Sequence, residues 1–104
     1  MRNELVSILD IETSKEYIEY IKTLNCLACG SFPVDADHLK AIGMGGNRKR
    51  SNVRDFTCIP LCRSCHTERH QLGNYQFEHK HSVNLWRDAF NYFVKYLTQR
   101  GLNE

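Results

Sequence analysis

The sequence predicts a small α+β domain in which two short strands lie between helices. The chain has 104 residues, which is the length of one small domain with a modest core. Its centre contains short apolar segments separated by turn residues and then a helical pattern, in the order strand, loop, strand and helix. Helical patterns also precede and follow this centre. We therefore expect one domain over residues 1–104, with a helix on either side of its core.

The flanking helices are predicted from apolar residues at helical spacing. Thr13 and Glu16 form a capping-box pattern, and the helix that they open should run to about Asn25. Its apolar face consists of Tyr17, Ile18, Ile21 and Leu24. Near the other terminus, Ser82 is predicted to cap a helix that runs to about Arg100. Its apolar stripe consists of Val83, Trp86, Phe90, Phe93 and Leu97. Packing on the domain is the main interpretation of this stripe, and an interface with a second chain is the alternative.

The centre is predicted to contain two strands, a loop and a helix. Residues 32–38 alternate apolar and acidic side chains, as a half-buried strand does. The Gly-rich segment 43–47 excludes regular structure, so a long loop should run to about Arg54. Residues 56–60 would complete a hairpin, and the helix after Cys62 should end at Gly73. Residues 74–82 are polar and are predicted to form a loop.

Four paired cysteines predict a structural zinc site. Cys26 and Cys29 form one Cys-x-x-Cys pair, and Cys62 and Cys65 form a second pair. Each pair can present two thiolates from one tight turn, and zinc prefers four such soft ligands in a tetrahedron. A redox-active dithiol and four unrelated buried thiols are the alternatives. Four thiolates leave no open position, so this ion should not be catalytic. The fifth cysteine, Cys58, is predicted to be a small buried hydrophobic residue.

A second group of polar residues has the donor types of a hydrolytic metal site. His66 and His70 are four residues apart on the predicted helix, so their imidazoles share one face. Asp37, at the end of the first strand, adds a hard oxygen ligand. An Asp/His/His set with vacant positions suits Mg²⁺ or Mn²⁺, and Zn²⁺ or Ni²⁺ can also bind. His38 should point away from Asp37 in a regular strand, or toward a substrate if the strand end twists.

The charge distribution indicates a polyanionic partner. The net charge is only +2, but residues 39–70 contain seven basic and two acidic residues, whereas residues 1–24 contain three and five. Four of the basic residues belong to the predicted loop: Arg48, Lys49, Arg50 and Arg54. A cluster of this kind beside a hydrolytic site suits a polyanionic ligand, and a solvated loop is the alternative. His79 and His81 lie in a polar segment and are predicted to be solvated.

The expected location is the cytoplasm. The N-terminal segment does not resemble a signal peptide, and no apolar run is long enough to span a bilayer. The five cysteines are therefore expected in a reducing compartment, where paired Cys-x-x-Cys motifs favour metal over disulfides.

These motifs together resemble those of the HNH endonucleases, the ββα-metal family. The matching residues are Asp37-His38 on the first strand, Asn52 near the end of the loop, and Cys65-His66-x-x-x-His70 on the helix. The two cysteine pairs match the zinc-knuckle branch of that family. A looser similarity links the same stretch, about residues 26–81, to the phage recombination-enhancement (Ref) nucleases. Many HNH nucleases have His-His where this chain has Asp37-His38, and Asn47 is a second candidate for the motif asparagine.

The resemblance implies a metal-dependent DNA endonuclease that leaves 5′-phosphate and 3′-hydroxyl ends. It implies that His38 is the general base, that Asn52 braces the loop, and that Asp37, His66 and His70 hold one divalent ion at the scissile phosphate. It also assigns Arg48, Lys49, Arg50 and Arg54 to backbone phosphates, which give affinity without sequence choice. The expected setting is recombination, repair or processing of DNA in a bacterium or a phage-infected cell.

Two other functions are consistent with the same sequence. The first is a zinc-stabilised nucleic-acid-binding module that does not cut, and the complete set of Asp37, His38, His66 and His70 argues against it. The second is a recombination accessory nuclease that is active only with a partner filament, and strong cleavage by the protein alone would argue against it. No long helix presents Arg, Asn or Gln for base edges. Low sequence specificity is therefore expected whether the nuclease acts alone or with a partner filament.

Overall fold

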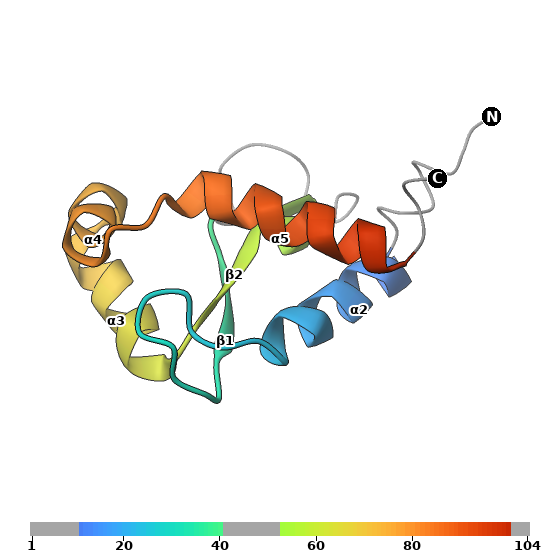
Figure 1. Ribbon diagram of the computed structural model, residues 1–104, viewed down its shortest axis with the longest axis horizontal. Coiled ribbons are helices and arrows are strands. Elements are labelled where there is room, and N and C mark those ends of the chain that lie inside the picture. The colour runs from blue at the N-terminus through green and yellow to red at the C-terminus, as the bar shows by residue number, and fades with distance from the viewer. Residues whose placement is uncertain (1–10, 41–52, 101–104) are drawn as a thin grey trace.

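A computed structural model describes residues 11–40 and 53–100, and these form a small α+β unit (Figure 1). A two-stranded sheet lies at its centre, with α3 and α4 toward one end, α2 toward the other and α5 running between them (Figure 1). The helices are α2 (Ile11–Lys22), α3 (Arg63–Leu72), α4 (Asn74–His81) and α5 (Leu85–Gln99), with the 3₁₀ helix η1 (Val53–Thr57). The strands are β1 (Asp35–His38) and β2 (Cys58–Leu61).

The two strands form an antiparallel pair that sets the direction of the polar side chains. Asp35 lies opposite Leu61, and Asp37 lies opposite Ile59. Residues two apart in a strand share a face, so both aspartates point to the side that α3 covers. The predicted hairpin is confirmed, but its second strand begins at Cys58, because Phe56 lies in η1.

Two hydrophobic clusters hold the helices against the sheet. One joins β2 to the first cysteine turn, α3, α4 and α5. Its fully buried members are Ile59, Leu61, Phe77 and Leu85. The other joins α2, η1 and α5 around Tyr17, whose ring centroid lies 5.4 Å from that of Phe56 and 5.0 Å from that of Tyr96. Such close aromatic contacts in a buried cluster fix α2 and α5 relative to η1.

The predicted helix near the N-terminus has the expected buried face but a different start. Tyr17 and Ile21 are fully buried, as predicted. Helix α2 already includes Ile11, so Thr13 lies inside it and the predicted cap at Thr13 is wrong. For a different helix, α3, the prediction that Gly73 ends the helix after Cys62 is confirmed, since Gly73 follows α3 with φ +87°.

The segment predicted as a loop after Gly73 is instead a helix. Helix α4 has a mostly polar sequence and a single buried side chain, Phe77. That one anchor holds the helix on the core, although it is too little apolar pattern to be recognised in the sequence. Ser82 ends α4 in the left-handed conformation, so the predicted cap there is also wrong. The cap of α5 is Asn84, whose side chain accepts a hydrogen bond from the Arg87 amide.

The buried face of α5 differs from the predicted stripe. Leu85, Ala89 and Tyr96 are buried, whereas Trp86 is 47% exposed and Phe90 is 64% exposed. The sequence contains apolar residues at helical spacing on two adjacent faces. The small Ala89 permits close packing, so the face that carries it turns inward.

Several predictions fall on residues outside the described parts of the chain. These residues are Asn47, Arg48, Lys49, Arg50 and Asn52. In the two described segments, no helix combines the length and the apolar character that crossing a membrane requires.

Candidate metal centres

The sulfurs of the four paired cysteines gather at one point, as predicted. Two come from the turn between α2 and β1, and two come from the start of α3. All four lie within 4.8 Å of one another, and the Sγ atoms of Cys29 and Cys62 are 3.7 Å apart. A zinc–sulfur distance of about 2.3 Å gives a tetrahedron with edges of about 3.8 Å. The four cysteines therefore fit a structural metal ion such as zinc.

The first cysteine turn is curled by its own backbone. The Cys29 amide donates to the Cys26 sulfur at 3.4 Å, and the Gly30 amide donates to the Cys26 carbonyl at 2.9 Å. Gly30 has φ +81°, a conformation that glycine adopts without a steric cost. The Leu27 amide donates to the Pro60 carbonyl at 2.8 Å, which ties the turn to β2. The turn thus presents two sulfurs and is anchored to the sheet.

The cysteine environments differ in how readily the thiolate forms. Hydrogen bonds with Ser31 lower the pKa of the Cys29 thiol to about 6, which favours the thiolate. Burial raises the pKa of the Cys65 thiol. Cys58 is fully buried outside the cluster, and burial together with nearby carboxylates raises its pKa to about 12. The prediction that Cys58 is a small buried residue is therefore confirmed.

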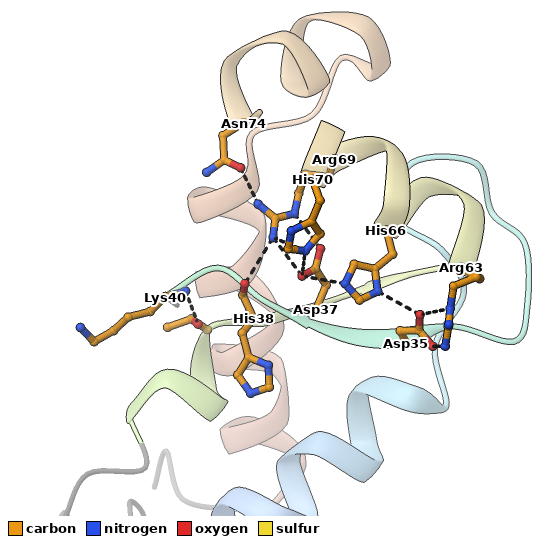
Figure 2. Close-up of polar contacts among 10 residues, drawn as sticks. Asp35, Asp37, His38, Lys40, Arg63, His66, Arg69, His70 and Asn74 are labelled. Atoms are coloured by element: carbon orange, nitrogen blue, oxygen red, sulfur yellow. Dashed lines mark hydrogen bonds and ion pairs between the residues drawn. The ribbon is translucent and has the colours of Figure 1, made fainter. Parts of the chain in front are cut away.

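Asp37, His66 and His70 form a second cluster between β1 and α3 (Figure 2). The Nε2 atoms of both histidines lie 3.4 Å from the same oxygen, Oδ1 of Asp37. Two ligands bound to one ion at about 2.1 Å are separated by about 3.0 to 3.4 Å in octahedral or tetrahedral geometry. The donor types and their spacing therefore fit one divalent cation.

Arg69, which lies on α3, forms a buried ion pair with Asp37. Its Nε donates to Oδ2 of Asp37 at 2.6 Å, and its Nη2 donates to Oδ1 at 2.9 Å (Figure 2). The side chains of Asp37 and Arg69 are only 2% and 8% exposed. Arg69 also donates to the carbonyl of His38 and to the side chain of Asn74. This two-pronged pair offsets the cost of burying the carboxylate and fixes its direction.

A second arginine–carboxylate pair borders the cluster on its exposed side. The Nε and Nη2 atoms of Arg63 donate to the two carboxylate oxygens of Asp35, at 2.8 and 3.2 Å. Asp35 also lies 2.9 Å from Nδ1 of His66. The hydrogen bond from Arg63, followed by that from His66, holds the pKa of Asp35 below its usual range. Beside this pair is an open hollow of about 340 Å³, lined by Asp35, Arg63, His66, Thr67 and His70.

His38 lies apart from His66 and His70, the two predicted metal ligands on α3. Its imidazole is on the opposite side of β1 from His66 and His70 (Figure 2). Its Nε2 atom lies 2.8 Å from Oδ1 of Asp55 in η1, and both side chains are about a quarter exposed. Arg54, the one described member of the predicted phosphate-binding set, is half-buried in η1. The structure thus brings Asp37, His66 and His70 together and leaves His38 on the other face.

Comparison with known proteins gives a family for the chain. Residues 9–96 match a family described as "protein of unknown function (DUF968)". The chain belongs to the DUF968 family. A relative from Escherichia coli K12, named uncharacterized protein YdfU, is 34% identical over 71 residues, which cover 68% of this chain. The chain spans only 20% of the length of that relative. No solved structure matches this DUF968 protein.

Three residues that contact the predicted site residues of this DUF968 protein were not themselves predicted from the sequence. Asp35, Asp55 and Arg69 each contact a predicted site residue, but their partners are 17 to 32 positions away. Only Asp35 could have been recognised from the neighbouring sequence, because it shares a strand face with Asp37.

The prediction of solvated histidines is confirmed for His79, which is exposed. It is wrong for His81, whose Nε2 lies 2.7 Å from Glu68 and whose ring packs on Phe77.

Proposed function

We propose that this DUF968 protein is a metal-dependent DNA endonuclease with an HNH-like (ββα-metal) core. One observation carries the proposal: Asp37, His66 and His70 converge from a strand and a helix beside an open hollow. The order strand, strand and helix, with a cysteine cluster at the start of the helix, supports it because the HNH resemblance implies the same order. The identification of DNA as the substrate rests on the resemblance and on the basic character of residues 39–70.

Asp37, His66 and His70 are the residues that would hold a divalent ion such as Mg²⁺ or Mn²⁺. When bound, such an ion supplies Lewis-acid polarisation of the phosphodiester and stabilises the charge that develops on it. Arg69 keeps the Asp37 carboxylate directed at the two imidazoles. Arg63 is 83% exposed at the rim of the hollow, where a backbone phosphate can reach its guanidinium. Arg48, Lys49, Arg50 and Arg54 would extend the contact with the backbone.

His38 is the proposed general base. A carboxylate only accepts hydrogen bonds, so the proton between His38 and Asp55 belongs to Nε2 of the imidazole. The lone pair that can take a proton from water is then on Nδ1. Because the ring lies across β1 from His66 and His70, this role requires the substrate phosphate to sit at the end of the strand. Asn52 keeps the supporting role that the resemblance implies.

The first test is cleavage of supercoiled plasmid by the purified, zinc-loaded protein. We expect nicking with Mg²⁺ or Mn²⁺, none with EDTA, and loss of nicking in His66→Ala. His79→Ala is the matched control, because it removes an exposed histidine outside the cluster. Equal cutting by His66→Ala and the wild type would contradict the proposal. DNA binding without cutting would favour the binding module, and cutting only with a recombinase filament would favour the accessory nuclease.

The role of His38 has a separate test. If His38 is the base, His38→Ala should lower the cleavage rate by about 10²- to 10⁴-fold, since a positioned base contributes that much. The affinities for DNA and for Mn²⁺ should stay unchanged, because the imidazole faces away from the metal ligands. Single-turnover cleavage beside a Mn²⁺ titration measures both. An unchanged rate would assign the base to another residue.

A further inference from the structure

The ring of His66 has a different carboxylate at each of its two nitrogens. Nδ1 lies 2.9 Å from Oδ2 of Asp35, which is a hydrogen-bond distance. Nε2 lies 3.4 Å from Oδ1 of Asp37, which is longer than a hydrogen bond between these atoms. That Asp37 oxygen already accepts a hydrogen bond from Arg69 at 2.9 Å. The single proton of a neutral His66 ring therefore belongs on Nδ1, where it is donated to Asp35.

This arrangement leaves the lone pair of Nε2 facing the carboxylate of Asp37. Two electron-rich atoms that face each other repel, and a cation bound between them would turn this repulsion into attraction. His70 presents its Nε2 to the same oxygen at the same distance, 3.4 Å. Asp35 itself does not belong to the group of ligand atoms that converge there. It acts on the group through His66.

Asp35 is in turn held in place by Arg63. Two hydrogen bonds from one guanidinium fix both carboxylate oxygens, so the acceptor for His66 Nδ1 has a defined direction. Asp35 and Asp37 are two residues apart on β1 and therefore lie on the same face of the strand. The strand thus supplies one carboxylate to each nitrogen of the same imidazole.

We propose that Asp35 is a positioning residue that fixes the tautomer and direction of His66 for a divalent ion. The proposal rests on the metal-dependent function proposed above and adds an outer shell to its metal site. A carboxylate that accepts the far N–H of a ligating imidazole locks the ring and raises its basicity, and its loss typically weakens metal binding by about 10- to 100-fold. His70 is the internal comparison, since in the described segments no carboxylate accepts from its Nδ1.

The test uses the zinc-loaded protein and Mn²⁺ as the probe, because a hard ion discriminates against the thiolate cluster. Electron paramagnetic resonance of free Mn²⁺ gives the dissociation constant of the wild type, Asp35→Ala, Asp35→Asn and Glu68→Gln. Glu68 is the matched control, because it lies on α3 between His66 and His70 but bonds Lys80 and His81. We expect a 10- to 100-fold increase for Asp35→Ala, a smaller one for Asp35→Asn, whose amide oxygen still accepts, and none for Glu68→Gln.

A second measurement keeps the proposal independent of DNA cleavage. Nitrogen chemical shifts of the imidazoles, recorded by NMR without Mn²⁺, should show the His66 proton on Nδ1 in the wild type and lose that preference in Asp35→Ala. Zinc content and thermal melting check that each variant is folded. A proton on Nε2 in the wild type, equal Mn²⁺ affinity in Asp35→Ala, or a wild type that binds no Mn²⁺ would overturn the proposal. A wild type that binds Mn²⁺ but does not cut DNA would overturn only the nuclease.

Discussion

The two candidate metal centres share α3 and differ in what surrounds their donor atoms. Cys65 and His66 are neighbours in that helix, yet the sulfur of Cys65 belongs to a group of four sulfurs, whereas the ring of His66 faces two carboxylates. The sulfurs of Cys26, Cys62 and Cys65 lie in or against the apolar cluster that contains Leu61, and Cys29 is exposed. The Asp37, His66 and His70 group includes the carboxylate of one arginine–carboxylate pair, Arg69–Asp37. It borders a second such pair, Arg63–Asp35, and an open hollow.

This difference separates a stabilising centre from an accessible one. Four thiolates fill a tetrahedral shell, and they bring enough negative charge to hold a divalent ion without help from neighbouring side chains. In the other centre, the charges of Asp35 and Asp37 are already balanced by Arg63 and Arg69. An added cation there gains less attraction and keeps vacant positions. We therefore expect zinc to be part of the folded core and the second ion to be exchangeable.

The largest expected effect is on the thiolate centre. Cys62→Ser removes one of four ligands, so the protein should lose its zinc and its cooperative thermal transition, because structural zinc contributes about 10–16 kcal/mol to small metal-dependent folds. Zinc content and circular dichroism on heating measure this. Cys58→Ala is the matched control and should keep its zinc, since Cys58 lies outside the cluster. Retention of zinc and of the wild-type melting curve by Cys62→Ser would contradict the assignment.

The next effect concerns the buried arginine of the other centre. Arg69→Met leaves the Asp37 carboxylate buried without its partner, which should lower the free energy of unfolding by about 3–5 kcal/mol. Urea denaturation measures the change. Arg69→Lys should lose less, because it keeps the charge but not the two-pronged contact. A loss below about 1 kcal/mol in Arg69→Met would mean that Asp37 is satisfied in another way.

A smaller effect should follow from chelation. Brief treatment with EDTA should remove added Mn²⁺ while one zinc per chain remains, because only the second centre has vacant ligand positions. Metal analysis before and after desalting measures this, and the melting temperature should change little. Equal loss of both metals would remove the distinction between the two centres.

The smallest effect is expected for the exposed arginine. Arg63 contacts Asp35 with the same two nitrogens that Arg69 uses on Asp37, but it is 83% exposed. Solvent screens such a pair, so Arg63→Ala should leave the melting temperature unchanged. A decrease as large as that of Arg69→Met would show that burial does not account for the difference between the two pairs.

The sequence was most informative where ligand spacing is local. Cys26 and Cys29, like His66 and His70, are placed together by a turn or a helix, so their convergence could be predicted. Asp35, Asp55 and Arg69 were missed as partners because each contact spans 17 or more positions and depends on how α3 and η1 pack on β1.

The elements were predicted less well where two patterns competed. Helix α5 offers two apolar faces, and only packing decides that Ala89 turns inward and Phe90 outward. Helix α4 has one buried anchor, Phe77, in a polar sequence, so its pattern resembled a loop. Burial against neighbouring elements determines both outcomes, and it is not encoded in a short window.

The placement of α3 along β1 has a consequence for insertions and deletions. Two residues of a strand advance about 6.6 Å, and four residues of a helix advance about 6 Å. The spacing from Asp35 to Asp37 along β1 therefore nearly equals the spacing from His66 to His70 along α3. One residue inserted between the aspartates would turn one of them to the other face of the strand. One residue removed between the histidines would rotate the second by about 100°. Within these two short segments, a change in length should therefore be tolerated less than a change of side chain.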